Sequence, residues 1–174
     1  MLQINIDATQ LNRELSGLLQ RLQHPASLMA AVAQSLESQT QQAFYQEGQP
    51  GGGKWQSLAA STIAQRTKGR KGPIPEQPSW PGQILNRRGG EGLLGSVMSA
   101  STSATATVGA GSGTSADYAK IHQFGGKAGR GRKVTIPARP YLPITPDAGN
   151  PTITPHAEKA IMKMALKFVE NGGS

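Results

Sequence analysis

Apolar residues near the start of the chain recur every three or four positions, which is the spacing of an amphipathic helix. A first helix is predicted from Asp7, an N-capping residue, to His24, because Pro25 disfavours helical geometry in the residue before it. Its apolar face is formed by Leu11, Leu15, Leu18, Leu19 and Leu22. A second helix is predicted to end at Gly48, with its apolar face at Leu28, Val32, Leu36, Thr40, Ala43 and Phe44. The pair predicts a helical hairpin over residues 7–47.

Shorter segments predict strands. Residues 2–6 alternate apolar and polar side chains, which is typical of a short strand. The span 93–110 contains valines and threonines, with Ser103-Ala104 as a weak turn between two strands. Residues 133–136 predict a further strand, which Pro137 stops because proline lacks the N–H group that a sheet needs. These segments predict an antiparallel sheet of three to five strands.

Two helices are predicted in the second half of the chain. The first covers residues 116–123 and is ended by a pair of glycines. Thr154 caps the second, and Pro155 takes its first position, where a missing N–H is tolerated. Its buried stripe is Ala157, Ile161, Met164, Ala165 and Phe168. The pattern therefore predicts an α+β fold, with an antiparallel sheet packed against two or three helices.

Residues 48–92 have a different composition. Ten glycines and five prolines fall within these 45 positions. A short helix is predicted over residues 61–66, but most of the segment is expected to be extended or mobile. We therefore expect long Gly/Pro-rich basic loops, above all a flexible loop over residues 66–92. A length of 174 residues suits one domain, so residues 1–174 are predicted to form a single unit.

The composition predicts a protein that depends on partners. Only 36% of residues are hydrophobic and 5% are aromatic, so we expect an oligomer to complete the burial of apolar surface. The absence of cysteine excludes disulfides and thiolate metal sites. No apolar run approaches the roughly 20 residues of a membrane-spanning helix. The start lacks the features of a signal peptide, so we expect a soluble protein made in the cytoplasm.

Positive charge is concentrated in the middle of the chain. The net charge of the whole sequence is +8, yet residues 50–139 hold 13 lysines and arginines against three acidic residues. One basic cluster is Arg66, Lys68, Arg70 and Lys71, a second is Arg87-Arg88, and a third is Arg130, Arg132 and Lys133. Such clusters favour a polyanion such as DNA, or an acidic protein face. Because no aromatic residue lies within them, contact with DNA is expected to be indifferent to sequence. A solubilising surface is the alternative.

Catalytic motifs are not supported. The segment 48–54 has the glycines of a phosphate-binding loop, but Trp55 replaces the hydroxyl residue, and a helix precedes it where a strand is required. Residues 109–113 lack the spacing of a dinucleotide-binding loop. His122 has no nucleophile elbow or oxyanion loop beside it, and a structural or interface role is favoured over a hydrolase. We expect no enzyme and no cofactor.

Two segments carry a family likeness. The first is Tyr-Ala-Lys-Ile-His-Gln-Phe-Gly-Gly at residues 118–126, and the second is Ile-Pro-Ala-Arg-Pro-Tyr-Leu at residues 136–142. With Phe44, Gly48, Trp55, Leu58, Thr62, Arg66, Ile84-Leu85, Leu93, Ser96 and Val108-Gly109, they resemble the phage virion morphogenesis family, the tail-completion proteins of Mu-like and P2-like tailed phages. The likeness runs from about residue 44 to residue 142.

The resemblance implies a noncatalytic virion protein that forms a ring, expected to be hexameric, at the head–tail junction. Other neck or tail proteins are the implied partners, and DNA passes through the ring. The implied location is the virion, after assembly in the host cytoplasm. Predicted interface residues are Tyr118, His122, Phe124, Arg139 and Tyr141, although the same aromatics could instead fold their loop onto its own core. A standalone nonspecific DNA-binding protein for packaging or condensation is the alternative.

Overall fold

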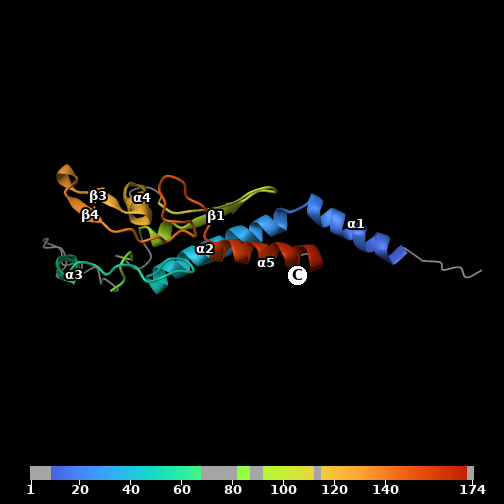
Figure 1. Cartoon of the computed structure of the whole chain (residues 1–174), viewed down its shortest axis with the longest axis horizontal. Coiled ribbons are helices and arrows are strands. Elements are labelled where there is room, and N and C mark those ends of the chain that lie inside the picture. Colours follow the sequence, from blue (N-terminus) through green and yellow to red (C-terminus); the bar gives the residue numbers. More distant parts are fainter. Residues whose placement is uncertain (1–8, 68–81, 87–91, 112–114, 172–174) are drawn as a thin grey trace, which may run out of the picture.

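Three long helices set the length of the molecule. They are α1 (Thr9–Gln23), α2 (Ala26–Gln46) and α5 (Pro155–Asn171) (Figure 1). The computed structural model describes residues 9–67, 82–86, 92–111 and 115–171. The strand predicted over residues 2–6 and the cap at Asp7 lie outside these ranges. Within them, no helix has the length and apolarity needed to cross a membrane.

The first two helices do not fold back on each other. Both lie where the sequence predicts them, but α1 runs away from the rest of the molecule along its long axis (Figure 1). Pro25, between them, has φ −79° and ψ 11°, which lies in the bridge region beside the helical one, and the chain keeps much of its direction there (Figure 1). The hairpin predicted over residues 7–47 is therefore two helices in an extended arrangement, and α1 instead touches α5.

Helix α2 ends at Gln46, two residues before the predicted glycine, and Glu47 is its C-cap. Glu47 takes the left-handed conformation at φ 51°, and its N–H reaches the carbonyls of Ala43 and Phe44. A left-handed non-glycine residue is uncommon, but the Glu47 carboxylate also accepts a hydrogen bond from the Ile84 N–H. Its side chain therefore joins the helix end to a distant segment, which glycine could not do.

Among the described residues, two small sheets stand in place of the predicted single sheet of three to five strands. Strands β1 (Met98–Ser101) and β2 (Ala106–Gly109) pair antiparallel, with Met98 opposite Gly109. Strands β3 (Gly126–Ala128) and β4 (Val134–Ile136) form a second antiparallel pair. Helix α4 (Ala116–Phe124) lies between the pairs in sequence and leads β3 away from β2 (Figure 1). The α+β class is confirmed, with a different sheet topology.

The segment after α2 is ordered at its start. Pro50 is buried, and a tight turn is closed by the Gln49 N–H donating to the Gly53 carbonyl at 3.0 Å. Lys54 donates to the carbonyl of Gln46, so its ammonium group is held against the helix end. The turn places Trp55 in the core, where its side chain anchors the end of the turn. Helix α3 (Ala60–Thr67) follows, close to its predicted position.

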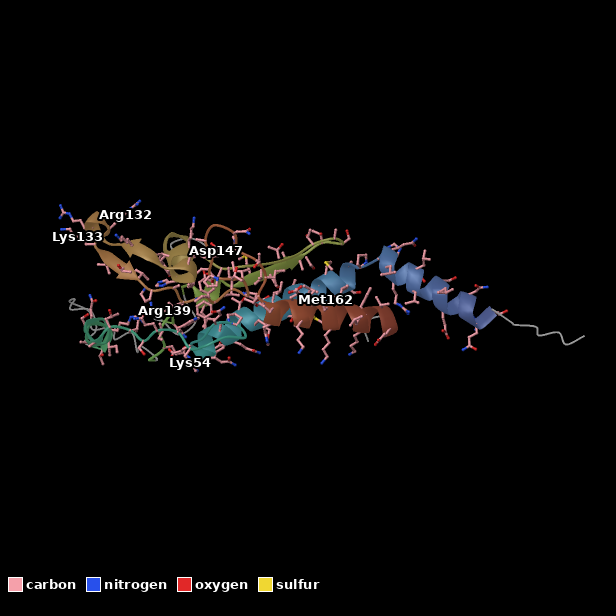
Figure 2. All side chains as sticks on the ribbon, viewed as in Figure 1. Lys54, Arg132, Lys133, Arg139, Asp147 and Met162 are labelled. Carbon is pink, nitrogen blue, oxygen red and sulfur yellow. The ribbon has the colours of Figure 1, made fainter. Side chains whose placement is uncertain are left out.

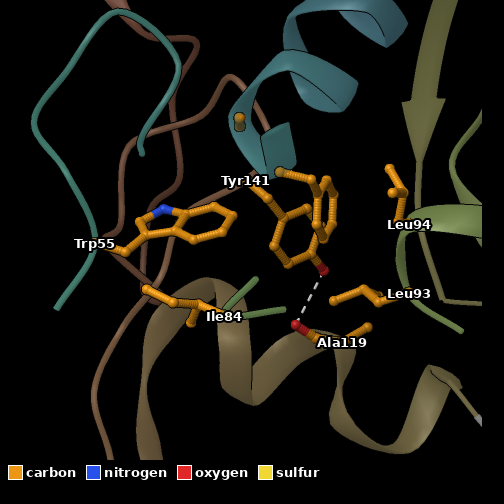
Figure 3. Packing of buried hydrophobic residues seen from close by; sticks show 8 residues of the cluster. Trp55, Ile84, Leu93, Leu94, Ala119 and Tyr141 are labelled. Atoms are coloured by element: carbon orange, nitrogen blue, oxygen red, sulfur yellow. Dashed lines mark hydrogen bonds between the residues drawn. The ribbon is translucent and has the colours of Figure 1, made fainter. Parts of the chain in front are cut away.

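Buried apolar residues form two clusters. The larger one joins the end of α2 to Trp55, the 3-10 helix η1 (Leu94–Ser96), α4 and Tyr141 (Figure 3). The smaller one contains Val32, Leu36 and Ala157, with partly buried Ile161 and Met164 against it. Helix α2 contacts both the β1–β2 pair and α5, so it is the central element of the molecule.

Candidate functional site

The two segments that carry the family likeness lie against each other. Gln123 of α4 is 1% exposed, and its Oε1 accepts hydrogen bonds from the N–H groups of Tyr141 and Leu142, each at 3.0 Å. A buried irregular segment must satisfy its backbone N–H groups, and here one amide oxygen serves two of them. Gln123 therefore fixes the segment 137–142 to the helix.

Tyr141 is a core residue of the subunit. Its hydroxyl donates to the carbonyl of Ala119 at 3.0 Å, and its ring lies 5.2 Å from the ring of Phe44 (Figure 3). Phe44 in turn meets Trp55 edge to face at 5.9 Å. Burial raises the pKa of the Tyr141 phenol to about 12, so the hydroxyl remains a donor at any ordinary pH. Three aromatic residues from distant parts of the chain thus form one contact group.

Arg139 is also inside the fold. Its backbone N–H donates to the carbonyl of His122 at 2.7 Å. Its side chain donates to the carbonyls of Gln56 at 3.1 Å and Ser57 at 3.4 Å. Burial lowers the pKa of the guanidinium below its ordinary value, but arginine stays charged, so the carbonyl oxygens are the groups that solvate it. Arg139 therefore joins α4 to the irregular segment after Trp55.

His122 is held neutral. Burial first, and then the charges of Arg139 and Arg66, lower its pKa to about 4. Its ring meets the ring of Tyr118 at 5.8 Å in an edge geometry. Its Nδ1 is buried and has no hydrogen-bond partner among the described residues. A neutral imidazole with two neighbouring arginines is suited to packing.

Gly125 lets the two segments approach. Its φ of 75° and ψ of 178° belong to a region that only glycine occupies readily. A side chain there would put its Cβ 2.9 Å from the Ala138 nitrogen and 3.2 Å from the Ile136 oxygen. The pair of glycines predicted to end α4 is confirmed, and the close approach explains why the first of them is glycine.

The five predicted interface residues therefore divide into two groups. Arg139 and Tyr141 are 5% and 1% exposed, so a partner cannot reach them without opening the fold. Tyr118 is 36% exposed, and His122 and Phe124 are partly buried. For these three, a role in an interface stays a prediction. The alternative that the aromatics fold their loop onto its own core holds for Tyr141.

The predicted basic residues also divide into residues exposed at the surface and a residue bonded within the fold. Arg130, Arg132 and Lys133 are exposed at the tip of the hairpin formed by β3, η3 (Arg130–Arg132) and β4, with Lys127 exposed on β3 (Figure 2). No aspartate or glutamate occurs between residues 118 and 146. Arg66 instead donates to the carbonyl of Ile84 at 2.8 Å, inside its own subunit. Lys68, Arg70, Lys71, Arg87 and Arg88 lie outside the described residues.

Two features were not found from the sequence. One is Gln123, because nothing in a pattern of residue types distinguishes a buried amide from a solvated one. The other is the orientation of α1, whose leucines at positions 15, 19 and 22 are 49%, 59% and 61% exposed. The helical period predicted the apolar face correctly, but not that this face is turned to solvent. In the sequence, the signal for this exposure is the low hydrophobic content, from which an oligomer is predicted.

These observations define a class: a small, elongated α+β protein, whose signature residues hold the fold and whose exposed surfaces include an apolar helix and a basic hairpin. The chain belongs to the phage virion morphogenesis family, whose model matches residues 6–169. It is 38% identical over 147 residues to Mu-like prophage FluMu G protein 2 of Haemophilus influenzae, covering 84% of this chain and 86% of that protein. No solved structure gives a significant match.

Proposed function

We propose that the protein is a structural virion subunit that forms a ring at the head–tail junction of a tailed phage or prophage. In this role it is a tail terminator, a completion protein or a neck connector, and DNA passes through the ring. Membership of a virion morphogenesis family supports the general role. The observation that carries the ring is the separation of two surfaces: a basic hairpin at one end of the molecule and an exposed apolar helix at the other (Figures 1 and 2).

A ring around DNA needs both kinds of surface. Copies must contact one another through apolar area, and positive charge without local carboxylates favours contact with the DNA. The exposed Arg130, Arg132 and Lys133 meet the second requirement, since they lie in a stretch without acidic residues. Six subunits are expected by resemblance to the family. The partners in this proposal are further copies of the chain, other neck or tail proteins, and the genomic DNA.

Electron microscopy tests the ring. Purified protein without DNA should form closed rings, and antibody-labelled virions should carry the label at the head–tail junction. The alternative, a standalone DNA-binding protein, predicts particles only in the presence of DNA and no label at that junction. Labelling elsewhere on the virion would overturn the proposed location.

The salt dependence of DNA binding tests the basic hairpin. Each phosphate that a lysine or arginine neutralises contributes about −0.9 to the log–log slope of affinity against salt concentration. Changing Arg130, Arg132 and Lys133 to serine should therefore reduce the slope magnitude by up to about 3 per subunit. The matched control changes Lys159, Lys163 and Lys167 of α5, which removes the same charge from another exposed surface. Equal effects of the two variants would show that only net charge matters.

A further inference from the structure

The β3–β4 hairpin projects from the subunit with both of its faces uncovered. From Gly126 to Thr135 every residue except Ala128 is exposed, so the described part of the chain packs on neither face of this ribbon. The hairpin lies at the end of the molecule opposite α1, with Arg132 and Lys133 at its tip (Figures 1 and 2). A two-stranded ribbon without a covering layer is marginally stable by itself, which favours a partner that encloses it.

The tip of the hairpin is a tight reversal of the chain. Gly129 and Gly131 adopt φ of 78° and 71°, and the Arg132 N–H donates to the Gly129 carbonyl at 3.0 Å. Arg132 itself has φ 53°, a left-handed conformation that is costly for a residue other than glycine. A glycine at this position would avoid the cost but would lose the guanidinium, which indicates a use for the charge.

The alternation of side chains gives the ribbon two different faces. Lys127 lies opposite Thr135 in the register, and Ala128 lies opposite Val134. Because successive side chains of a strand point to opposite faces, the first pair shares one face and the second pair shares the other. The face of Ala128 and Val134 has only small, uncharged side chains, and Val134 is 54% exposed. This face is therefore suited to a close approach, while the cations lie on the other face and at the tip.

We infer that the hairpin lies in the major groove of double-stranded DNA, with the face of Ala128 and Val134 toward the base edges. This inference rests on the proposed contact between the hairpin and DNA, and it names the part of the DNA that is contacted. The major groove is about 12 Å wide and admits a two-stranded ribbon, whereas the minor groove is about 6 Å wide. Paired strands lie about 4.8 Å apart, so a ribbon with small side chains fits the wider groove.

Phosphates border the groove on both sides, and the hairpin carries cations in matching places. Lys127 lies on β3, Lys133 directly precedes β4, and Arg130 and Arg132 lie in the turn between the strands. Such long side chains can bend around the edge of a ribbon while their apolar stems stay against it. Residues 125–136 include no asparagine, glutamine, aspartate or glutamate, the side chains that read adenine and cytosine. We therefore expect the contact to depend mainly on phosphates.

Methylation of DNA by dimethyl sulfate tests which groove is occupied. The reagent modifies guanine N7, which lies in the major groove, and adenine N3, which lies in the minor groove. The full-length protein, saturating a duplex of mixed sequence, should reduce methylation of guanine N7 and leave that of adenine N3 unchanged. The variant with Arg130, Arg132 and Lys133 changed to serine should lose this protection at the same concentration.

Two tyrosine variants test the orientation of the ribbon. Val134→Tyr enlarges the face that approaches the bases, whereas Thr135→Tyr makes a similar change on the opposite face, and both positions are exposed. Tyrosine is favoured in strands and is uncharged at neutral pH, so neither change should disturb the hairpin. Val134→Tyr should weaken binding to duplex DNA several-fold, and Thr135→Tyr should leave it unchanged. Equal affinities of the two variants would contradict the orientation.

Lys127 supplies a test of charge outside the tip. Lys127→Ser should reduce the magnitude of the log–log salt slope by about 0.9, the contribution of one phosphate contact. The matched control, Lys120→Ser, removes the same charge from an exposed position on α4 and should leave the slope unchanged. Equal reductions would show that the charge of the whole region, and not the ribbon, determines the contact.

Two further results would overturn the inference. If the triple-serine variant lowers the salt slope while guanine N7 stays reactive under the wild-type protein, the proposed contact with DNA stands and entry into the groove is eliminated. If neither the slope nor the methylation responds, while the same variant no longer binds an acidic neck or tail protein in a pulldown, the hairpin meets protein instead of DNA. The ring and its place in the virion, tested by microscopy, stand or fall separately.

Discussion

Replacing Gln123 by methionine tests whether one side chain holds the segment 137–142 against α4. Methionine has about the same length but offers no strong acceptor to the N–H groups of Tyr141 and Leu142. Each buried N–H left unpaired costs about 1–3 kcal/mol, which gives a loss of about 2–6 kcal/mol in the free energy of unfolding. Gln123 Nε2 is itself buried without a partner among the described residues, and its removal relieves one unsatisfied group. We therefore expect the lower half of that range, about 2–4 kcal/mol.

Urea and thermal unfolding, followed by circular dichroism, measure this loss. For a chain of this length, about 3 kcal/mol corresponds to a decrease in Tm of about 6–12 °C. The protein concentration must be kept where a single species sediments, because assembly adds apparent stability by mass action. Tyr141→Phe is the matched control: it removes one hydroxyl from the same cluster and should cost only about 1 kcal/mol. A Gln123→Met protein as stable as Tyr141→Phe would refute the reasoning.

Two further predictions concern the same region. The free energy of unfolding should decrease by up to about 3 kcal/mol as the pH falls from 6.5 to 4, because folded His122, with its pKa lowered to about 4, stays neutral while the unfolded side chain takes up a proton. A His122→Gln variant, compared by urea titration at each pH, should lack this part of the decrease, and identical pH profiles would contradict it. Gly125→Ala should lower the free energy of unfolding by about 2–4 kcal/mol, because of the backbone conformation at this position and the contact with Ala138. Gly53→Ala has open space around it and should change this free energy by less than about 0.5 kcal/mol. Equal melting temperatures for the two alanine variants would refute the backbone argument.

Local signals predicted the elements of the fold well. The proline at position 155 and the threonine before it mark the start of α5, and the glycines after Phe124 mark the end of α4. The turn between β1 and β2 lies at the predicted place, where the Thr102 N–H donates to the Thr105 carbonyl at 2.9 Å. These features depend on residues close together in the chain, which is why their sequence alone suffices.

Arrangement was harder to predict because it depends on distant contacts. A proline between two helices signals a break in hydrogen bonding but not a direction, and at Pro25 the chain continues along the molecule instead of turning back (Figure 1). Strand patterns do not state which strands pair, so the sequence predicts one sheet where the structure has two short hairpins. Likewise, a rigid aromatic can anchor a core or a partner, and only the burial of Tyr141 between Phe44 and Ala119 distinguishes the two.

The residues that identify the family and the residues exposed for assembly are largely different. Gln123, Arg139 and Tyr141 satisfy backbone groups inside one subunit, where geometry restricts each position to very few residue types. The exposed leucines of α1 and the basic hairpin need only apolar or positive side chains, which many residues supply. Likeness in the segments 118–126 and 136–142 therefore reports a shared fold of the subunit, and it says little about which partners the subunit meets. What a member assembles with has to be argued from its exposed surfaces, and in the described part of this chain those surfaces include α1, Met162 and Leu166 of α5, and the tip of the β3–β4 hairpin.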